Sequence, residues 1–257
     1  SFLDALPEDA LTNLTIDIIQ DLHLTYDTFR TDTSRTSISL HPLKSLHEVT
    51  QAREELPTTT PGQGSAPEES GATAGATWQL MICTRERAGT LAKIAGVLSA
   101  NGLNILSAQL ISTQAGLVLD MFHVEKVRQS PHPNAPAPEF TLQRQEKLRT
   151  ELREVLDDGR DVAELLRHRL AQHRSPMVGA PEAAVKIIGH QDLSDDYTVL
   201  ELHGPDRPGL LHDIARALHE HDIEIRFSKL DLLGNQAIDT FYVESMLGEG
   251  KLTDPQL

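Results

Sequence analysis

The chain repeats part of its own sequence, and this repetition constrains the fold more than any other feature. When residues 84–110 are aligned with residues 204–230, a shift of 120 positions, eight of the 27 residues are identical. The identical pairs are Arg87/Arg207, Gly89/Gly209, Leu91/Leu211, Ile94/Ile214, Ala95/Ala215, Leu98/Leu218, Ile105/Ile225 and Leu110/Leu230. After a one-residue shift in a turn, Asp120, Phe122 and Val124 match Asp239, Phe241 and Val243. A loop, a helix face and a strand recur in one order, so the chain contains a duplicated βαββ core.

The first copy shows which elements build this core. Residues 78–84 predict a buried strand, and an apolar stripe at the i, i+3, i+4, i+7 spacing predicts an amphipathic helix, with Leu91, Ile94, Ala95 and Leu98 on its core face. Gly102 supplies a left-handed cap that ends the helix. Further strands are expected over 103–112, 117–125, 183–190 and from Tyr197 onward, and helices over 139–158 and 160–173.

Composition divides the chain into four stretches. Residues 1–56 predict a helical leading segment, since Leu11, Leu14, Ile18 and Leu22 recur at helical spacing through about Phe29. Residues 57–77 are rich in Pro, Gly, Ser, Thr and Ala and contain no large apolar side chain, which predicts a flexible linker that proteases cut first. Residues 78–191 are expected to form a first module with a helical connector, and residues 192–257 a second module.

The two ends of the chain suggest a fragment. Thr253-Asp254-Pro255 has the N-cap and first-turn proline of a starting helix, yet the chain stops at Leu257. We therefore expect the second module to be incomplete at its C-terminus. At the other end, the chain begins with Ser1 and not with an initiator methionine.

Charge and cysteine content limit the partners and the compartment. The formal net charge is −15, and no long Lys/Arg run offsets it, so nucleic acid and anionic membranes are poor partners. The single cysteine, Cys83, builds neither a disulfide framework nor a cysteine zinc site and suits a reducing cytoplasm. No apolar run approaches the roughly 20 residues that span a bilayer, and no signal peptide is evident.

Two loops that join a strand to a helix are the candidate binding elements. In the second copy, Gly204–Leu211 (GPDRPGLL) precedes a helix N-terminus, whose unpaired backbone N–H groups favour an anion such as a carboxylate. Spacing alone favours a structural alternative, in which Asp206 caps the helix, Pro208 starts it and Gly209 allows close helix–sheet packing. Asn104, directly after the first helix cap, either caps a turn or presents its amide to a ligand.

Searches for catalytic chemistry find none. There is no Walker phosphate loop, no Gly-Xaa-Ser-Xaa-Gly elbow and no zinc-ligand set, so we expect neither catalytic residues nor a metal site here. His212-Asp213 is interpreted as a pair of solvent-exposed helix residues, because its counterpart Ala92-Lys93 cannot bind metal. Cys83 is interpreted as a small buried hydrophobe.

The two copies resemble ACT domains. The passages TVLELHGPDRPGLLHDIARALHEHDIEI and LDLLGNQAIDTFYVES are similar to the C-terminal ACT repeat of the bacterial bifunctional uridylyltransferase/uridylyl-removing enzymes that act on the PII protein. The spacing of the copies, the helical connector and the closing GKLTDP match that arrangement, so the resemblance covers 78–257. The first copy departs from it, with Glu86 and Ala88 where the family usually has Asp and Pro.

The resemblance implies an α+β fold of tandem ferredoxin-like βαββαβ modules. Each module would have a four-stranded antiparallel sheet with helices on one face, and the other face would be left for pairing. The third strand supports this arrangement, because Phe122 and Val124 lie on one of its faces and Leu117, Leu119 and Met121 on the other.

The resemblance also implies a cytoplasmic glutamine sensor that controls nitrogen assimilation. The family's nucleotidyltransferase and HD phosphohydrolase domains, which would need Mg²⁺ and act on PII, would lie upstream, and this region itself would need no cofactor. Two alternatives stay open: a stand-alone tandem ACT regulator that binds an amino acid and acts by protein contact, and a dimerisation module without a ligand. A nucleotidyltransferase signature upstream of Ser1 would distinguish the first alternative, and titration with glutamine the second.

By the same resemblance, the effector would lie where one module's strand-to-helix loop meets its neighbour. We expect at least one site, built around Arg85–Leu91 with Asn104 or around Asp206–Leu211. The predicted ligand-binding residues are Arg85, Glu86, Arg87, Gly89, Asn104, Asp206, Arg207, Gly209 and Leu210. The counterpart of Asn104 is Glu224, whose charge cannot match an amide in the same way, so the two sites should differ in affinity.

Overall fold

The computed structural model describes most of the two repeats and the helix and strand that precede them. The described residues are 2, 6, 16–43, 77–87, 89–111, 113, 116–126, 139–172, 185–205, 209–233, 236–248 and 250–252. The expected linker and the expected helix start after Leu252 lie outside this part of the chain, except that Thr77 is already the first residue of a strand. No helix among the described residues is long and apolar enough to cross a membrane.

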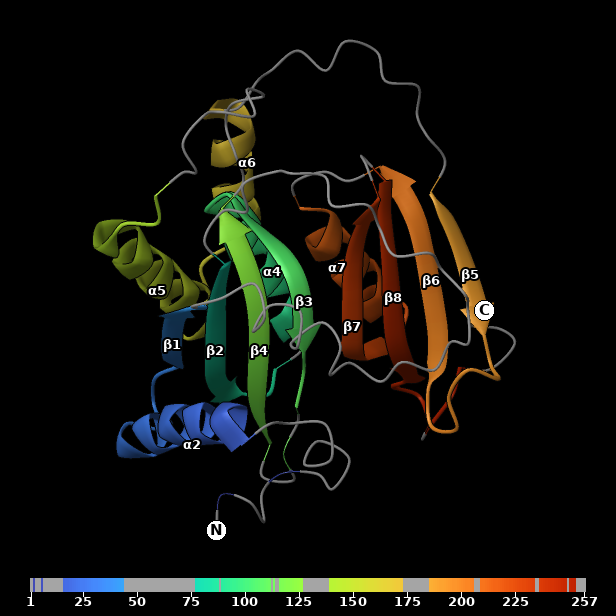
Figure 1. Ribbon diagram of the computed structural model, residues 1–257, viewed down its shortest axis with the longest axis horizontal. Coiled ribbons are helices and arrows are strands. Elements are labelled where there is room, and N and C mark those ends of the chain that lie inside the picture. The colour runs from blue at the N-terminus through green and yellow to red at the C-terminus, as the bar shows by residue number, and fades with distance from the viewer. Residues whose placement is uncertain are drawn as a thin grey trace.

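Eight strands form one antiparallel sheet in the order β1-β2-β4-β3-β7-β8-β6-β5 (Figure 1). The strands are β1 (Ser37–Pro42), β2 (Thr77–Arg85), β3 (Leu103–Gln109), β4 (Leu117–Lys126), β5 (Lys186–His190), β6 (Thr198–Pro205), β7 (Ile223–Leu233) and β8 (Gln236–Ser245). The helices are α2 (Ile16–Thr31), α4 (Thr90–Ala100), α5 (Leu142–Leu156), α6 (Val162–Gln172) and α7 (Leu210–Glu220). The expected α+β class and antiparallel sheet are confirmed.

The two repeats join edge to edge, which corrects the expectation of two separate sheets. The first copy supplies β2, α4, β3 and β4, and the second supplies β6, α7, β7 and β8. Strand β3 pairs with β7 from Ser107↔Lys229 to Gln109↔Phe227. Each of these strands would otherwise be an edge with unpaired backbone groups, and their pairing satisfies those groups. A β-bulge recurs at the same place in both, between Ile105 and Ser107 and between Ile225 and Phe227.

The sequence predicted the outer strand β5, within 183–190, but it did not predict the outer strand β1. Strand β1 belongs to the leading segment, which is therefore not only helical, and it pairs with β2. Strand β5, which we expected within the first module, pairs with β6 and extends the half of the sheet built from the second copy. A short connection between β5 and β6 favours this antiparallel neighbour. The division of the chain into modules remains a prediction.

Both faces of the first half of the sheet are apolar, as expected, but both are covered. Phe122 and Val124 belong to the core beneath α4, α5 and α7. Leu119 and Met121 face the other way and pack with Leu22 and Phe29 of α2. Figure 1 shows α2 lying across one end of this half of the sheet. Helix α2 thus covers part of the face of the first half that was expected to be free for pairing.

Helices α4 and α7 pack side by side behind the sheet (Figure 1). His212 of α7 lies against α4. This histidine is 7% exposed, and its Nδ1 lies 2.6 Å from the Ala92 carbonyl oxygen. The expectation of a solvent-exposed His212 is therefore wrong. Positions 92 and 212 are related by the repeat, so the small Ala92, together with Gly96, leaves the space that the imidazole fills.

Candidate functional site

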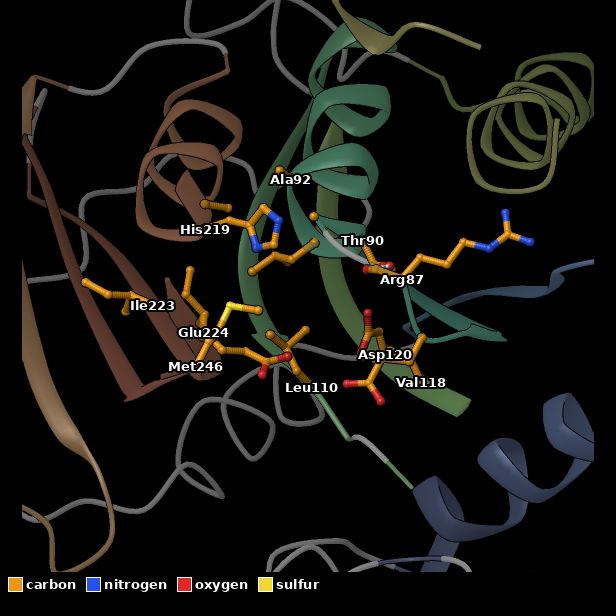
Figure 2. A pocket seen from close by; sticks show the side chains of 15 residues that line it. Arg87, Thr90, Ala92, Leu110, Val118, Asp120, His219, Ile223, Glu224 and Met246 are labelled. Carbon is orange, nitrogen blue, oxygen red and sulfur yellow. Dashed lines mark hydrogen bonds between the residues drawn. The ribbon is translucent and has the colours of Figure 1, made fainter. Parts of the chain in front are cut away.

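A cavity of about 330 Å³ lies where the first copy's strand-to-helix loop meets the second copy (Figure 2). Its volume falls in the range of small-molecule sites. The first copy contributes its loop, the first turn of α4 and residues at the ends of β3 and β4. The second copy contributes the C-terminal half of α7, the start of β7 and Met246, which follows β8. Neither copy would enclose this space alone. The lining residues are Glu86, Arg87, Gly89, Thr90, Leu91, Ala92, Leu110, Val118, Asp120, Ala215, His219, Ile223, Glu224, Ile225 and Met246.

The loop side of the cavity is shaped by a glycine at the start of α4. Gly89 has a φ of 70°, in the left-handed region that favours glycine, and it allows the chain to turn sharply into the helix. The Glu86 backbone N–H donates to the Gly116 carbonyl at 2.9 Å, and the Thr90 hydroxyl donates to the Arg87 carbonyl at 2.6 Å. These bonds fix the loop against the neighbouring turn and place the N-terminus of α4 at the cavity.

Arg87 is part of the loop, but its charged end lies elsewhere. Its Nη1 donates to the Leu156 carbonyl at 2.6 Å, and Figure 2 shows the side chain extending away from the other labelled residues. The repeated arginine therefore ties the loop to the end of α5. It does not offer its guanidinium to the cavity.

Across the cavity, Glu224 and His219 come from the second copy (Figure 2). Burial raises the pKa of the Glu224 carboxyl, and the nearby Arg226 opposes this increase. Arg226 lies 3.5 Å from Glu224 and 2.5 Å from Glu244, so one guanidinium serves two carboxylates. This wall therefore keeps a net negative charge.

Asp120, on β4, is the most deeply buried polar group of the cavity. It is 1% exposed, and burial, reinforced by Glu86, raises the pKa of its carboxyl well above the usual range. The backbone N–H of Ile111 donates to the carboxyl. Its Oδ1 atom has no hydrogen-bond partner among the described residues. A buried oxygen without a donor is costly, which makes Asp120 a candidate contact for a ligand.

The structure brings together only part of the predicted site. Glu86, Arg87 and Gly89 line the cavity, whereas the exposed Arg85 does not. Asn104 also lies outside the lining, and its amide donates to Glu125 at 3.2 Å. The loop meets Glu224, the repeat partner of Asn104, and not Asn104 itself.

The second copy's loop is described only in part. Gly209 (φ 84°) and Leu210 are buried at the start of α7, while Asp206 and Arg207 lie outside the described residues. The binding role of all these residues remains a prediction. Sequence reasoning did not propose Asp120, His219 or Glu224 as ligand contacts, although the recurrence of Asp120 as Asp239 within an apolar strand was a usable signal.

The arrangement suits binding rather than covalent chemistry. Burial raises the pKa of the Cys83 thiol to about 12, so this side chain is a buried hydrophobe, as predicted. Among the described residues, no group of three or more His, Cys, Asp or Glu side chains is placed to hold a metal ion. The cavity instead combines apolar walls with a few carboxyl groups and a helix N-terminus, features common in small-molecule sites.

Comparison with known proteins agrees with this fold. A family model described as the ACT domain matches residues 198–230, which span β6, α7 and most of β7. The chain thus contains an ACT domain, and the internal repeat places the first copy's core in the same class. No solved structure matches the chain.

The chain is homologous, over about two thirds of its length, to bacterial bifunctional uridylyltransferase/uridylyl-removing enzymes. The Caulobacter vibrioides enzyme is 31% identical over 179 residues, which cover 68% of this chain and 18% of that enzyme. The Gluconobacter oxydans enzyme is 29% identical (69% and 18% covered), and the Cereibacter sphaeroides enzyme is 32% identical (62% and 16% covered). The matched region is therefore less than a fifth of each relative.

Proposed function

We propose that this chain is the regulatory region of a PII uridylyltransferase/uridylyl-removing enzyme and that it binds an amino acid, glutamine first among the candidates, in the cavity between its two ACT copies. The observation that supports this most directly is the lining of the cavity, which comes from both copies. A ligand held there contacts both halves of the molecule at once. Its binding energy therefore depends on how the halves sit against each other, which is the requirement for a regulatory signal.

The groups around the cavity match the functional groups of an amino acid. The start of α4 offers backbone N–H groups and a favourable field for the α-carboxylate. Glu86, Asp120 and Glu224 offer acceptors for the α-ammonium. Leu110, Val118 and Ile223 give apolar walls for a short side chain.

In the whole protein, this binding would set the direction of the reaction on PII. Upstream catalytic domains would add UMP to PII when glutamine is scarce and remove it when glutamine is plentiful. Those domains would use Mg²⁺, whereas this region would need no cofactor. The described residues would supply the sensing step and leave the chemistry to the upstream domains.

The test is calorimetric titration of the chain with L-glutamine, using Glu224→Gln as the cavity variant. Removing the charge from one partly buried partner should weaken binding by about 1–3 kcal/mol. Glu220→Gln is the matched control, because this exposed residue on α7 pairs with Arg216 and does not line the cavity. Binding that is equally tight in both variants would place the ligand elsewhere. The absence of any heat with the parent chain would reject glutamine sensing by this region.

A further inference from the structure

We propose that the cavity recognises its ligand by a primary ammonium group that pairs with Asp120, and that this ammonium replaces a proton which the carboxyl holds when the cavity is empty. The proposal rests on the function proposed above and deepens it, because it names the chemical class of the ligand and makes binding depend on pH. It is carried by the position and partners of Asp120.

Asp120 carries a carboxyl group that lies among apolar core residues. Its neighbours across β2 and along β4 are Ile82 and Phe122, which are both fully buried core residues. The carboxyl receives one backbone N–H, from Ile111, and Oδ1 remains without a donor among the described residues. It also lines the cavity, where a ligand can supply the missing donor.

Within the part of the chain that the structure describes, the groups that face Asp120 supply no cation to balance its charge. The residue of strand β2 opposite Asp120 is the apolar Ile82, and the loop contributes Glu86, which adds repulsion. Strand β7 contributes Glu224, and α7 contributes His219 at the far side of the cavity (Figure 2). Arg226 is engaged with Glu224 and Glu244. In this surrounding an empty cavity favours the neutral carboxylic acid.

A primary ammonium fits these groups better than other cations or an anion. Its N–H groups can donate to Oδ1 and to a second carboxylate, while its carbon chain contacts Leu110, Val118 and Met246. A bare metal ion would need several converging ligands, and none of the described residues form such a group. A purely anionic ligand would be repelled by Glu86 and Glu224.

Pairing with an ammonium changes the protonation of Asp120 in a defined way. The carboxylic O–H gives its proton to the buffer, and the carboxylate then accepts a hydrogen bond from the ligand nitrogen. No other bond forms or breaks. Because the pKa of the Asp120 carboxyl in the empty site is raised, its proton must leave when the ligand binds at neutral pH. At pH values below that pKa, the affinity should therefore increase by up to about tenfold for each unit by which the pH rises.

The experiment compares L-glutamine with glutaramate, the same molecule without its α-amino group, by calorimetry between pH 5.5 and 8. In two buffers of different ionisation enthalpy, glutamine should release up to one proton and bind more tightly as pH rises, and glutaramate should not bind. In Asp120→Asn, the pH dependence and the proton release should disappear, and glutamine binding at pH 8 should weaken at least about tenfold. Asp239→Asn is the matched control, since this repeat-related carboxyl is also buried but does not line the cavity, and it should behave as the parent chain does.

A ligand-free measurement makes the inference independent of the choice of probe. Carbon-13 NMR of aspartate carboxyl groups should show one protonated carboxyl at pH 7 that is missing in Asp120→Asn. An ionised Asp120 in the empty protein would overturn the inference. So would glutamine binding that is independent of pH or unchanged in Asp120→Asn, although the proposed function would then stand. Failure of glutamine to bind the parent chain at any pH would instead reject the proposed function, together with the pairing step.

Discussion

Single residues decide how the two copies differ despite their common fold. Glu224 stands where the first copy has Asn104, and this exchange makes one wall of the cavity acidic. His212 stands where the first copy has Ala92, and it bonds to that residue's carbonyl. Buried ionisable groups such as Asp120 and His123 add a dependence of stability on pH, because the folded state shifts their protonation.

His123 should make the protein sensitive to acid. It is 5% exposed, its Nδ1 lies 2.8 Å from the Ser107 hydroxyl, and burial lowers its pKa from 6.5 to about 4. As the pH falls, the His123 imidazole takes up a proton in the unfolded chain before it does so in the folded protein. The contribution of neutral His123 to stability is therefore full above pH 6.5 and is lost between pH 6.5 and 4. The loss should reach about 3 kcal/mol in the free energy of unfolding.

Urea unfolding of His123→Gln between pH 7.5 and 4.5 measures this contribution. The variant should show a flatter pH dependence than the parent chain. His41→Gln, which alters an exposed histidine on β1, is the control and should leave the slope unchanged. Equal slopes in the parent chain and His123→Gln would show that the His123 imidazole does not control acid stability.

At the scale of elements, the contact between α4 and α7 holds the cavity in shape. The two helices begin at repeat-related glycines, Gly89 and Gly209, which both have a left-handed backbone conformation. Gly96 allows the close approach, because a methyl group there would lie 2.5 Å from Val162 and 2.9 Å from the His212 ring. One missing side chain therefore allows α4 to pack against both α6 and α7.

Replacing Gly96 with alanine should destabilise the protein although alanine favours helices. The expected clash costs about 1–3 kcal/mol, which exceeds the helix-propensity gain of about 0.5–1 kcal/mol. Gly248→Ala is the control, since a methyl group at that exposed glycine meets nothing within 4 Å. Thermal unfolding should show a lower midpoint for Gly96→Ala and little change for Gly248→Ala. A Gly96→Ala variant as stable as the parent chain would mean that the helices separate without cost.

At the scale of the whole molecule, the β3–β7 pairing joins the two copies into one sheet (Figure 1). The two copies also share the cavity. A ligand in that cavity should protect both copies together. In hydrogen exchange, glutamine should slow the amides of residues 86–92 and of residues 219–225, while β1 at the far edge changes little. Protection of one stretch without the other would indicate that the ligand contacts a single copy.

The sequence by itself determined the duplicated core and the two apolar faces of β4, and its resemblance to ACT domains implied the α+β class. The core follows from the internal repeat and the faces of β4 from local alternation, which needs no knowledge of distant residues. The repeat also placed equivalent loops at the starts of α4 and α7. It indicated where a binding site would begin, but it did not show which residues would complete it.

Only the tertiary structure decided which residues meet. Strands β1 and β5 take the outer positions by pairing with the edges of β2 and β6. Such pairing is made by backbone N–H and C=O groups, which every residue type carries, so the sequence gives little indication of which strand will pair there. The pairing of β3 with β7 brings Glu224 opposite the first loop and leaves Asn104 outside the cavity. His212 is a polar residue on the face of α7 that we expected to be exposed to solvent. It is buried because α4 packs against that face. Contacts between distant segments depend on the assembled shape, and local patterns do not encode that shape.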